Sequence, residues 1–92
     1  MRKIEKDMLK AIENAQNKVL GNTYVNPVIG GIEVWLHENH IATVDYSYGG
    51  SVTVNKETLR KYPTNTTKSR LRALGVDVRT VKGVTMLDGI PV

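Results

Sequence analysis

Two histidines and a glutamate lie together in the run His37-Glu38-Asn39-His40, and these side chains bind metals and transfer protons. A zinc-protease signature has two residues between its glutamate and second histidine on a helix, so that both imidazoles share one face. Here the spacing is one residue short, and we expect the run at the tip of a hairpin. The histidines can face each other across that hairpin, but a metal site needs three or four ligands. We therefore predict exposed turn histidines, with no metal and no other cofactor.

Nucleophilic catalysis has no support in the sequence. The chain contains no cysteine and no Gly-x-Ser-x-Gly elbow, which would place a serine at a strand-to-helix turn. It also lacks the glycine motifs that bind phosphate groups, and its acids are too scattered to be paired across a cleft. We predict no catalytic residues and a protein that is not an enzyme.

The sharper chemical signal is a basic segment, which runs from Lys56 to Arg72. Six bases and one acid give it an excess of five positive charges, more than the net charge of +4 of the whole chain. Such polarisation favours an anionic partner. Within the segment, threonines and cations surround the expected start of a helix, where free backbone N–H groups and the helix dipole favour phosphate. The predicted nucleic-acid-binding or anion-binding residues are Lys56, Arg60, Lys61, Thr66, Thr67, Lys68, Arg70 and Arg72.

A purely structural interpretation of that helix remains open. Its threonines can simply satisfy their own backbone, which makes it a well-capped surface helix with solvated cations. Whether the helix binds an anion or is only structural, we expect Lys68 and Arg72, four residues apart, to be exposed on one helical face.

A second hypothesis concerns the expected hairpin over residues 32–46, which carries apolar and aromatic residues on both faces although one packed face would suffice. We interpret this as a surface that binds a host protein complex. Trp35 and Tyr48 are the candidate interface anchors, because binding energy concentrates in such side chains. Two apolar faces and an edge strand also favour a homodimer, and light scattering that gives a mass near 10.2 kDa would argue against it.

The elements that must position these residues begin with an amphipathic helix. Apolar residues recur every three or four positions from Ile4 to Val19, which predicts a helix over residues 3–20 that ends at Gly21. Residues 23–28, 32–37, 41–46 and 52–54 then predict strands. We expect a two-residue turn at Glu38-Asn39.

The second half is predicted to be mostly helical before it ends in strands. Asn55 can cap a short helical turn over residues 56–61, which Pro63 terminates. A second helix begins at one of the four residues 64–67 and ends at Gly75. A final hairpin turns at Lys82-Gly83. The order α-β-β-β-β-α-β-β predicts a single α+β domain over residues 1–92, with a mainly antiparallel sheet, an N-terminal helix and a second helix before a C-terminal hairpin.

Several stretches of the sequence resemble a group of small, largely uncharacterised tailed-phage proteins. They are Asn22-Thr23-x-Val25, Leu36-His37-x-Asn39-x-Ile41-Ala42 and Pro63-Thr64-x-Thr66-Thr67-Lys68-Ser69-Arg70-Leu71-x-Ala73-Leu74. The resemblance covers most of the chain and implies a phage origin. The resemblance itself implies no activity, but small non-structural phage proteins often act by binding: they coat or bridge nucleic acid, or they block a host enzyme or a defence complex such as CRISPR.

The composition sets the expected compartment. The absence of cysteine suits a reducing cytoplasm, and the chain has no apolar run near the ~20 residues of a membrane span. We therefore expect the protein to act in the host cytoplasm, on nucleic acid or on a host protein complex and not on a membrane. An inhibitor that mimics DNA would be acidic, whereas this chain is basic.

Overall fold

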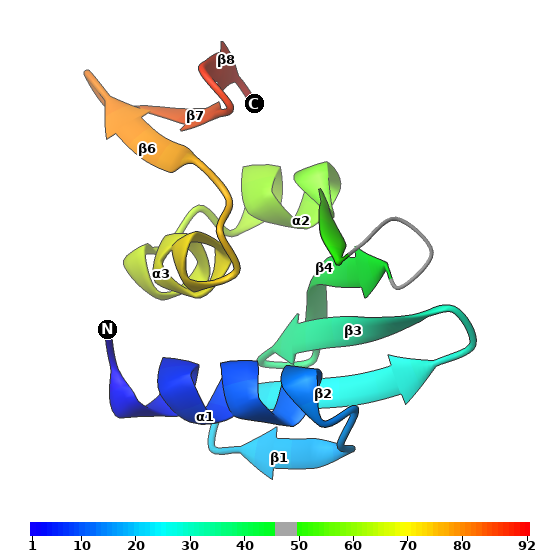
Figure 1. Cartoon of the computed structure of the whole chain (residues 1–92). Coiled ribbons are helices and arrows are strands. Elements are labelled where there is room, and N and C mark those ends of the chain that lie inside the picture. The colour runs from blue at the N-terminus through cyan, green and yellow to red at the C-terminus, as the bar shows by residue number, and fades with distance from the viewer. Residues whose placement is uncertain (46–49) are drawn as a thin grey trace.

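The computed structural model describes residues 1–45 and 50–92, and within them it contains two antiparallel sheets and three helices (Figure 1). In chain order the elements are α1 (Lys3–Glu13), β1 (Lys18–Leu20), β2 (Thr23–Val28), β3 (Gly31–Leu36), β4 (Asn39–Asp45), β5 (Ser51–Val54), α2 (Lys56–Lys61), α3 (Asn65–Ala73), β6 (Val78–Val81), β7 (Val84–Leu87) and β8 (Ile90–Pro91). The predicted α+β class is confirmed.

The larger sheet runs in the order β1-β2-β3-β4-β5, and its apolar face carries the core. Val25, Val34 and Ala42 lie opposite one another along neighbouring strands and are fully buried. The same core receives side chains from α1, α2 and α3, so the helices cover this face and leave the other face open. The smaller sheet, β6-β7-β8, extends beyond α3 at the end of the molecule away from β1 (Figure 1).

The first helix is shorter than the sequence predicted. α1 ends at Glu13, with Asn14 as its C-cap and Ala15 at a positive φ of 49°. Asparagine favours caps and turns over helix interiors, so two asparagines within residues 14–17 oppose continuation of the helix. The prediction of a helix over residues 3–20 is therefore wrong beyond Glu13.

The last three residues of the predicted helix form strand β1, an edge strand that pairs with β2. Its central residue Val19 is 69% exposed on the open face, not buried on a helical stripe. A β-branched side chain suits an extended backbone. Gly21, at a φ of 61°, belongs to the β1–β2 turn and does not cap a helix.

The β3–β4 turn lies one residue earlier than predicted. Its two central residues are His37 and Glu38, at φ values of 49° and 67°, which correspond to the mirror-image turns that suit hairpins. A bulge follows, because Val34 pairs with Ala42 while Trp35 pairs with His40, so that Ile41 has no partner. Trp35 therefore lies opposite His40 and not opposite Ala42.

Glu38 provides a direct test of strain in this turn. A side chain at positive φ costs about 1–2 kcal/mol relative to glycine, which has no Cβ. We expect Glu38→Gly to raise the free energy of unfolding by about 1 kcal/mol in urea denaturation. Glu57→Gly, in the first turn of the short helix α2, is the control and should lower it, because glycine is a poor helix former and the acid near the helix N-terminus is lost. A destabilised Glu38→Gly variant would contradict the assigned turn.

The second half of the chain follows the sequence prediction closely. Asn55 caps α2 by accepting a hydrogen bond from the backbone N–H of Thr58. Gly75, at a φ of 91°, ends α3, since its N–H bonds to the Arg72 carbonyl and the N–H of the next residue bonds to the Leu71 carbonyl. The hairpin at Lys82-Gly83 is confirmed, and β8 adds a third short strand to it.

Candidate functional site

The basic segment does not form one continuous surface. Arg70 is only 2% exposed, and its guanidinium is directed into the protein. Its Nη1 donates to Glu5 Oε2 at 2.8 Å, its Nε to Thr23 Oγ1 at 2.9 Å and its Nη2 to Asn22 Oδ1 at 3.3 Å. Each guanidinium nitrogen therefore already has a partner within the fold. The structure places Arg70 in a buried ion pair, away from any anion-binding surface.

Glu5 is the acidic partner of this buried pair, with a side chain only 3% exposed. Its Oε2 also accepts the Ser69 hydroxyl at 2.5 Å. Burial raises the pKa of the Glu5 carboxyl, but the hydrogen bonds from Ser69 and Arg70 outweigh it, so the pKa lies below its ordinary value of 4.5. Arg70 thus joins α3 to α1 and β2 while Glu5 stays ionised.

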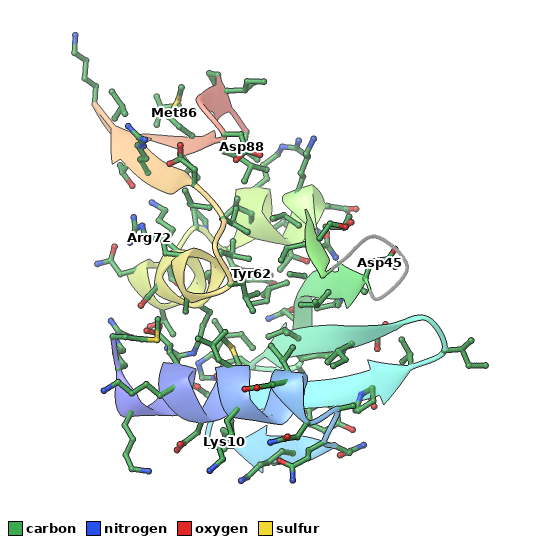
Figure 2. The ribbon with its side chains drawn as sticks, in the orientation of Figure 1. Lys10, Asp45, Tyr62, Arg72, Met86 and Asp88 are labelled. Atoms are coloured by element: carbon green, nitrogen blue, oxygen red, sulfur yellow. The ribbon has the colours of Figure 1, made fainter. Side chains whose placement is uncertain are left out.

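The other two cations of α3 also make contacts within the fold. Lys68 is only 6% exposed, and its Nζ donates to Thr80 Oγ1 on β6 at 2.5 Å. Arg72 is exposed but projects toward β6, where its Nε donates to the Val78 carbonyl at 2.7 Å (Figure 2). The prediction that Lys68 and Arg72 are a pair of exposed charges is wrong for Lys68. Both residues instead hold the C-terminal sheet against α3.

The start of α3 satisfies its own backbone. Thr64 is the N-cap, since its Oγ1 accepts the backbone N–H of Thr67 at 3.1 Å. The two hydroxyls also lie 2.9 Å apart, and Thr67 is only 2% exposed. Thr66 is half-buried and lies within the helix. The arrangement corresponds to the capped-helix alternative, and it does not bring Thr66, Thr67, Lys68 and Arg70 to one anion.

Of the four residues 64–67 at which the helix could begin, Thr64 is therefore the one that a capping test should change. We expect Thr64→Ala to lower the free energy of unfolding by about 1 kcal/mol, because it leaves the Thr67 N–H without its acceptor. Thr66→Ala, two residues later and within the helix, should cost less, since alanine is the better helix former. Thermal and urea melting of both variants measure this, and equal losses would contradict the cap assignment.

Three of the predicted cations remain on the surface of α2: Lys56, Arg60 and Lys61. Lys61 lies 3.8 Å from Glu57, an exposed pair of little energetic weight. Lys56 and Arg60 border a shallow hollow of about 280 Å³ against the C-terminal residues. This exposed group is what remains of the basic segment as a surface.

The open face of the larger sheet carries a second group of candidate residues. Tyr24 on β2 lies directly opposite Trp35 on β3, and the Trp35 and His40 rings have centroids 5.3 Å apart. Tyr24 and Trp35 border a hollow of about 750 Å³ with Val19, which we call the aromatic hollow. Its rim is formed by asparagines and by the β3–β4 turn. The predicted anchor Trp35 is therefore at this site, whereas Tyr48 lies outside the described residues.

Hydrogen bonds connect the polar side chains along this face. Asn17 Nδ2 donates to the Tyr24 hydroxyl at 3.0 Å, and that hydroxyl donates to Asn26 Oδ1 at 3.3 Å. Glu33 Oε1 accepts from Asn26 Nδ2 at 3.1 Å and from Trp35 Nε1 at 3.3 Å. None of Asn17, Tyr24, Asn26 and Glu33 was among the site residues predicted from the sequence. The alternation of side chains along β2 and β3 could have placed the last three on one face of the sheet. Asn17 could not be placed there, because the residues of β1, which borders the hollow, were predicted to be helical.

The two histidines occupy different positions. His37 lies exposed in the turn, whereas His40 Nε2 lies 2.8 Å from Thr43 Oγ1 and its Nδ1 lies 3.3 Å from Asn55 Nδ2. Within residues 1–45 and 50–92, no three histidine, cysteine, aspartate or glutamate side chains are grouped as metal ligands. No helix of the described chain is long and apolar enough to cross a bilayer.

Comparison with known proteins identifies the family of this chain. A family model described as Kyanoviridae Gp96 protein matches residues 1–89. The chain belongs to this family. It is therefore a phage protein, as the resemblance in its sequence implied. No curated protein and no solved structure matches the chain. The Kyanoviridae Gp96 family match covers both the aromatic hollow and α3.

Proposed function

We propose that this phage protein binds a host protein complex through the open face of its larger sheet and thereby inhibits it. The observation that carries the proposal is the aromatic hollow, where Tyr24 and Trp35 form a cross-strand pair at the surface. Tryptophan and tyrosine are enriched among the residues that dominate interface energetics. A host enzyme or a defence complex such as CRISPR is the class of target we expect.

The charges support a protein target over nucleic acid. Arg70 and Lys68 were predicted to bind phosphates, but both are buried and hydrogen-bonded within the fold. None of the described residues that line the aromatic hollow is a lysine or arginine. Bases can stack on aromatic rings, but nucleic-acid binding also needs cations along the phosphate backbone.

A pull-down from nuclease-treated host lysate tests the proposal when it is done with matched variants. We expect a stoichiometric protein partner that the wild type and Lys56→Ala/Arg60→Ala retain and that Trp35→Ala loses. Circular dichroism melting shows whether Trp35→Ala is folded, and Trp35→Phe keeps an aromatic anchor if alanine disrupts the sheet. Equal capture by the wild type and a folded Trp35→Ala variant would contradict binding through this face.

A second candidate function is nucleic-acid binding by the exposed cations of α2. Three cations within a six-residue helix favour it. Fluorescence anisotropy with labelled duplex and single strands should then show binding that weakens as salt rises, with a log–log slope of about −0.9 for each duplex phosphate neutralised. Lys56→Ala/Arg60→Ala should lose it and Trp35→Ala should keep it. The absence of binding even at low salt would exclude this function.

A further inference from the structure

We infer that the aromatic hollow binds an arginine side chain, and that the partner presents this arginine. The biological part of this inference rests on the proposed function, since it describes what the host protein places on the sheet. The chemical part concerns only the hollow and can be tested with short peptides. Three features of the site carry it: its charge, the surroundings of the Trp35 ring and its hydrogen-bonded order.

The charge of the hollow favours a cation. Its lining includes the exposed carboxylate of Glu38 but no lysine or arginine among the described residues, and Glu33 lies beside it. In the described part of the chain, Glu38 has no hydrogen-bond or ion-pair partner, and both hydrogen bonds to Glu33 use Oε1 and leave Oε2 available. A phosphate or carboxylate would find no counter-charge here, whereas a cation would find two.

The surroundings of Trp35 favour a guanidinium among cations. The indole Nε1 donates to Glu33 Oε1 at 3.3 Å, so a carboxylate lies at the edge of the ring. Tryptophan is the best aromatic partner for a cation over its face. A planar guanidinium can stack on the ring and donate to a neighbouring carboxylate at the same time, and it is more weakly hydrated than a lysine ammonium.

The order of the site lowers the cost of binding. The hydrogen bonds that join Asn17, Tyr24, Asn26, Glu33 and Trp35 hold these side chains in one arrangement before a ligand arrives. Side chains that are already ordered lose less conformational entropy when a partner binds. The same hydrogen bonds hold the Glu33 carboxylate beside the ring.

Trp35 itself reports binding, because it is the single tryptophan of the chain. We would titrate the protein with a Gly/Ser peptide that contains two arginines, and with matched peptides in which both are lysine or citrulline. Citrulline keeps the shape of arginine without its charge. We expect saturable change in Trp35 emission with the arginine peptide, and weakening by about fivefold or more with lysine and more with citrulline. No saturable change, or equal binding of the arginine and citrulline peptides, would overturn the inference.

Variants of the two acidic residues test whether the arginine binds at the aromatic hollow. Glu33→Gln keeps an amide oxygen that Asn26 and Trp35 can donate to, and Glu38→Gln changes only an exposed turn residue. We expect each to weaken the arginine peptide by about threefold or more and to leave the citrulline peptide unchanged. Glu57→Gln on α2 is the matched control and should change neither. An undiminished affinity in Glu33→Gln/Glu38→Gln would overturn the inference.

The two proposals can fail separately. If Trp35→Ala releases the host protein but the arginine peptide does not bind, the arginine inference is wrong and the proposed function stands. If the arginine peptide binds as expected but the host protein is captured without Trp35, the hollow has the inferred chemistry and the proposed function is wrong.

Discussion

Arg70→Ala should lower the free energy of unfolding by about 3–5 kcal/mol, because it leaves the Glu5 carboxylate buried without its cation. It also removes the donors to Thr23 and Asn22. A domain of this size has a total stability of about 5–14 kcal/mol, so the variant should lose a large fraction of it. Urea denaturation followed by circular dichroism measures the loss.

Arg60→Ala provides the matched control, since Arg60 is exposed on α2. A surface substitution of this kind changes stability by no more than about 0.5 kcal/mol. If Arg70→Ala is no less stable than Arg60→Ala, the buried ion pair does not hold α3 in place. Arg70→Lys keeps the charge but not the three-nitrogen geometry, and it should fall between the two.

The same ion pair predicts a dependence on pH. Because the pKa of Glu5 is lower in the folded protein than its ordinary 4.5, its contribution to stability is present in full above about pH 4.5. That contribution is lost as the pH falls through the lower pKa of the folded state. Urea midpoints from pH 7 to pH 2 should therefore show the advantage of the wild type over Glu5→Gln shrinking in acid. A constant difference across this range would contradict the assignment.

The second large effect is expected from Lys68→Ala combined with Arg72→Ala, which removes the two side-chain hydrogen bonds that these cations donate from α3 to β6. Hydrogen bonds from charged groups contribute about 1.5–3 kcal/mol each, and the share of the exposed Arg72 is smaller, so we expect a total loss of about 2–4 kcal/mol. Backbone amides of β6 and β7 should exchange with solvent before those of the larger sheet do. Hydrogen exchange followed by NMR resolves this order.

Arg79→Ala with Lys82→Ala is the control for this prediction. It also removes two cations, but from exposed positions in and beside β6, where Arg79 pairs with exposed Asp77. This control should keep its stability within about 1 kcal/mol. Equal melting of the two double variants would show that Lys68 and Arg72 are solvated charges and do not hold the sheet.

Local signals were sufficient for the second half of the chain. Asn55, Pro63 and Gly75 delimit the two helices in the sequence, and the structure has them at those places. The hairpin at Lys82-Gly83 was equally predictable. Each of these features depends on the backbone preferences of one or two residues and on hydrogen bonds within a few positions, so the surrounding fold has little influence on them.

Tertiary structure decided where α1 ends and how β3 pairs with β4. Val19 fits a helical stripe as well as a strand, and only the pairing of Lys18–Leu20 with β2 selects the strand. The bulge at Ile41 likewise moves Trp35 opposite His40, and so brings the His40 ring against the Trp35 ring. Long-range pairing overrides a local period because it satisfies many backbone groups at once.

The cations of the basic segment show most clearly the difference between what local sequence and what long-range packing determine. The number of cations between Lys56 and Arg72 follows from the sequence alone, as does the start of α3 among threonines. It does not follow from the sequence that Arg70 meets a carboxylate 65 positions earlier in the chain, or that Lys68 reaches β6. A cation is available to a ligand only if the fold leaves it without a partner. A buried charge must be paired or hydrogen-bonded within the protein. The packing of α3 against α1, β2 and β6 therefore decides which cations of the basic segment remain available.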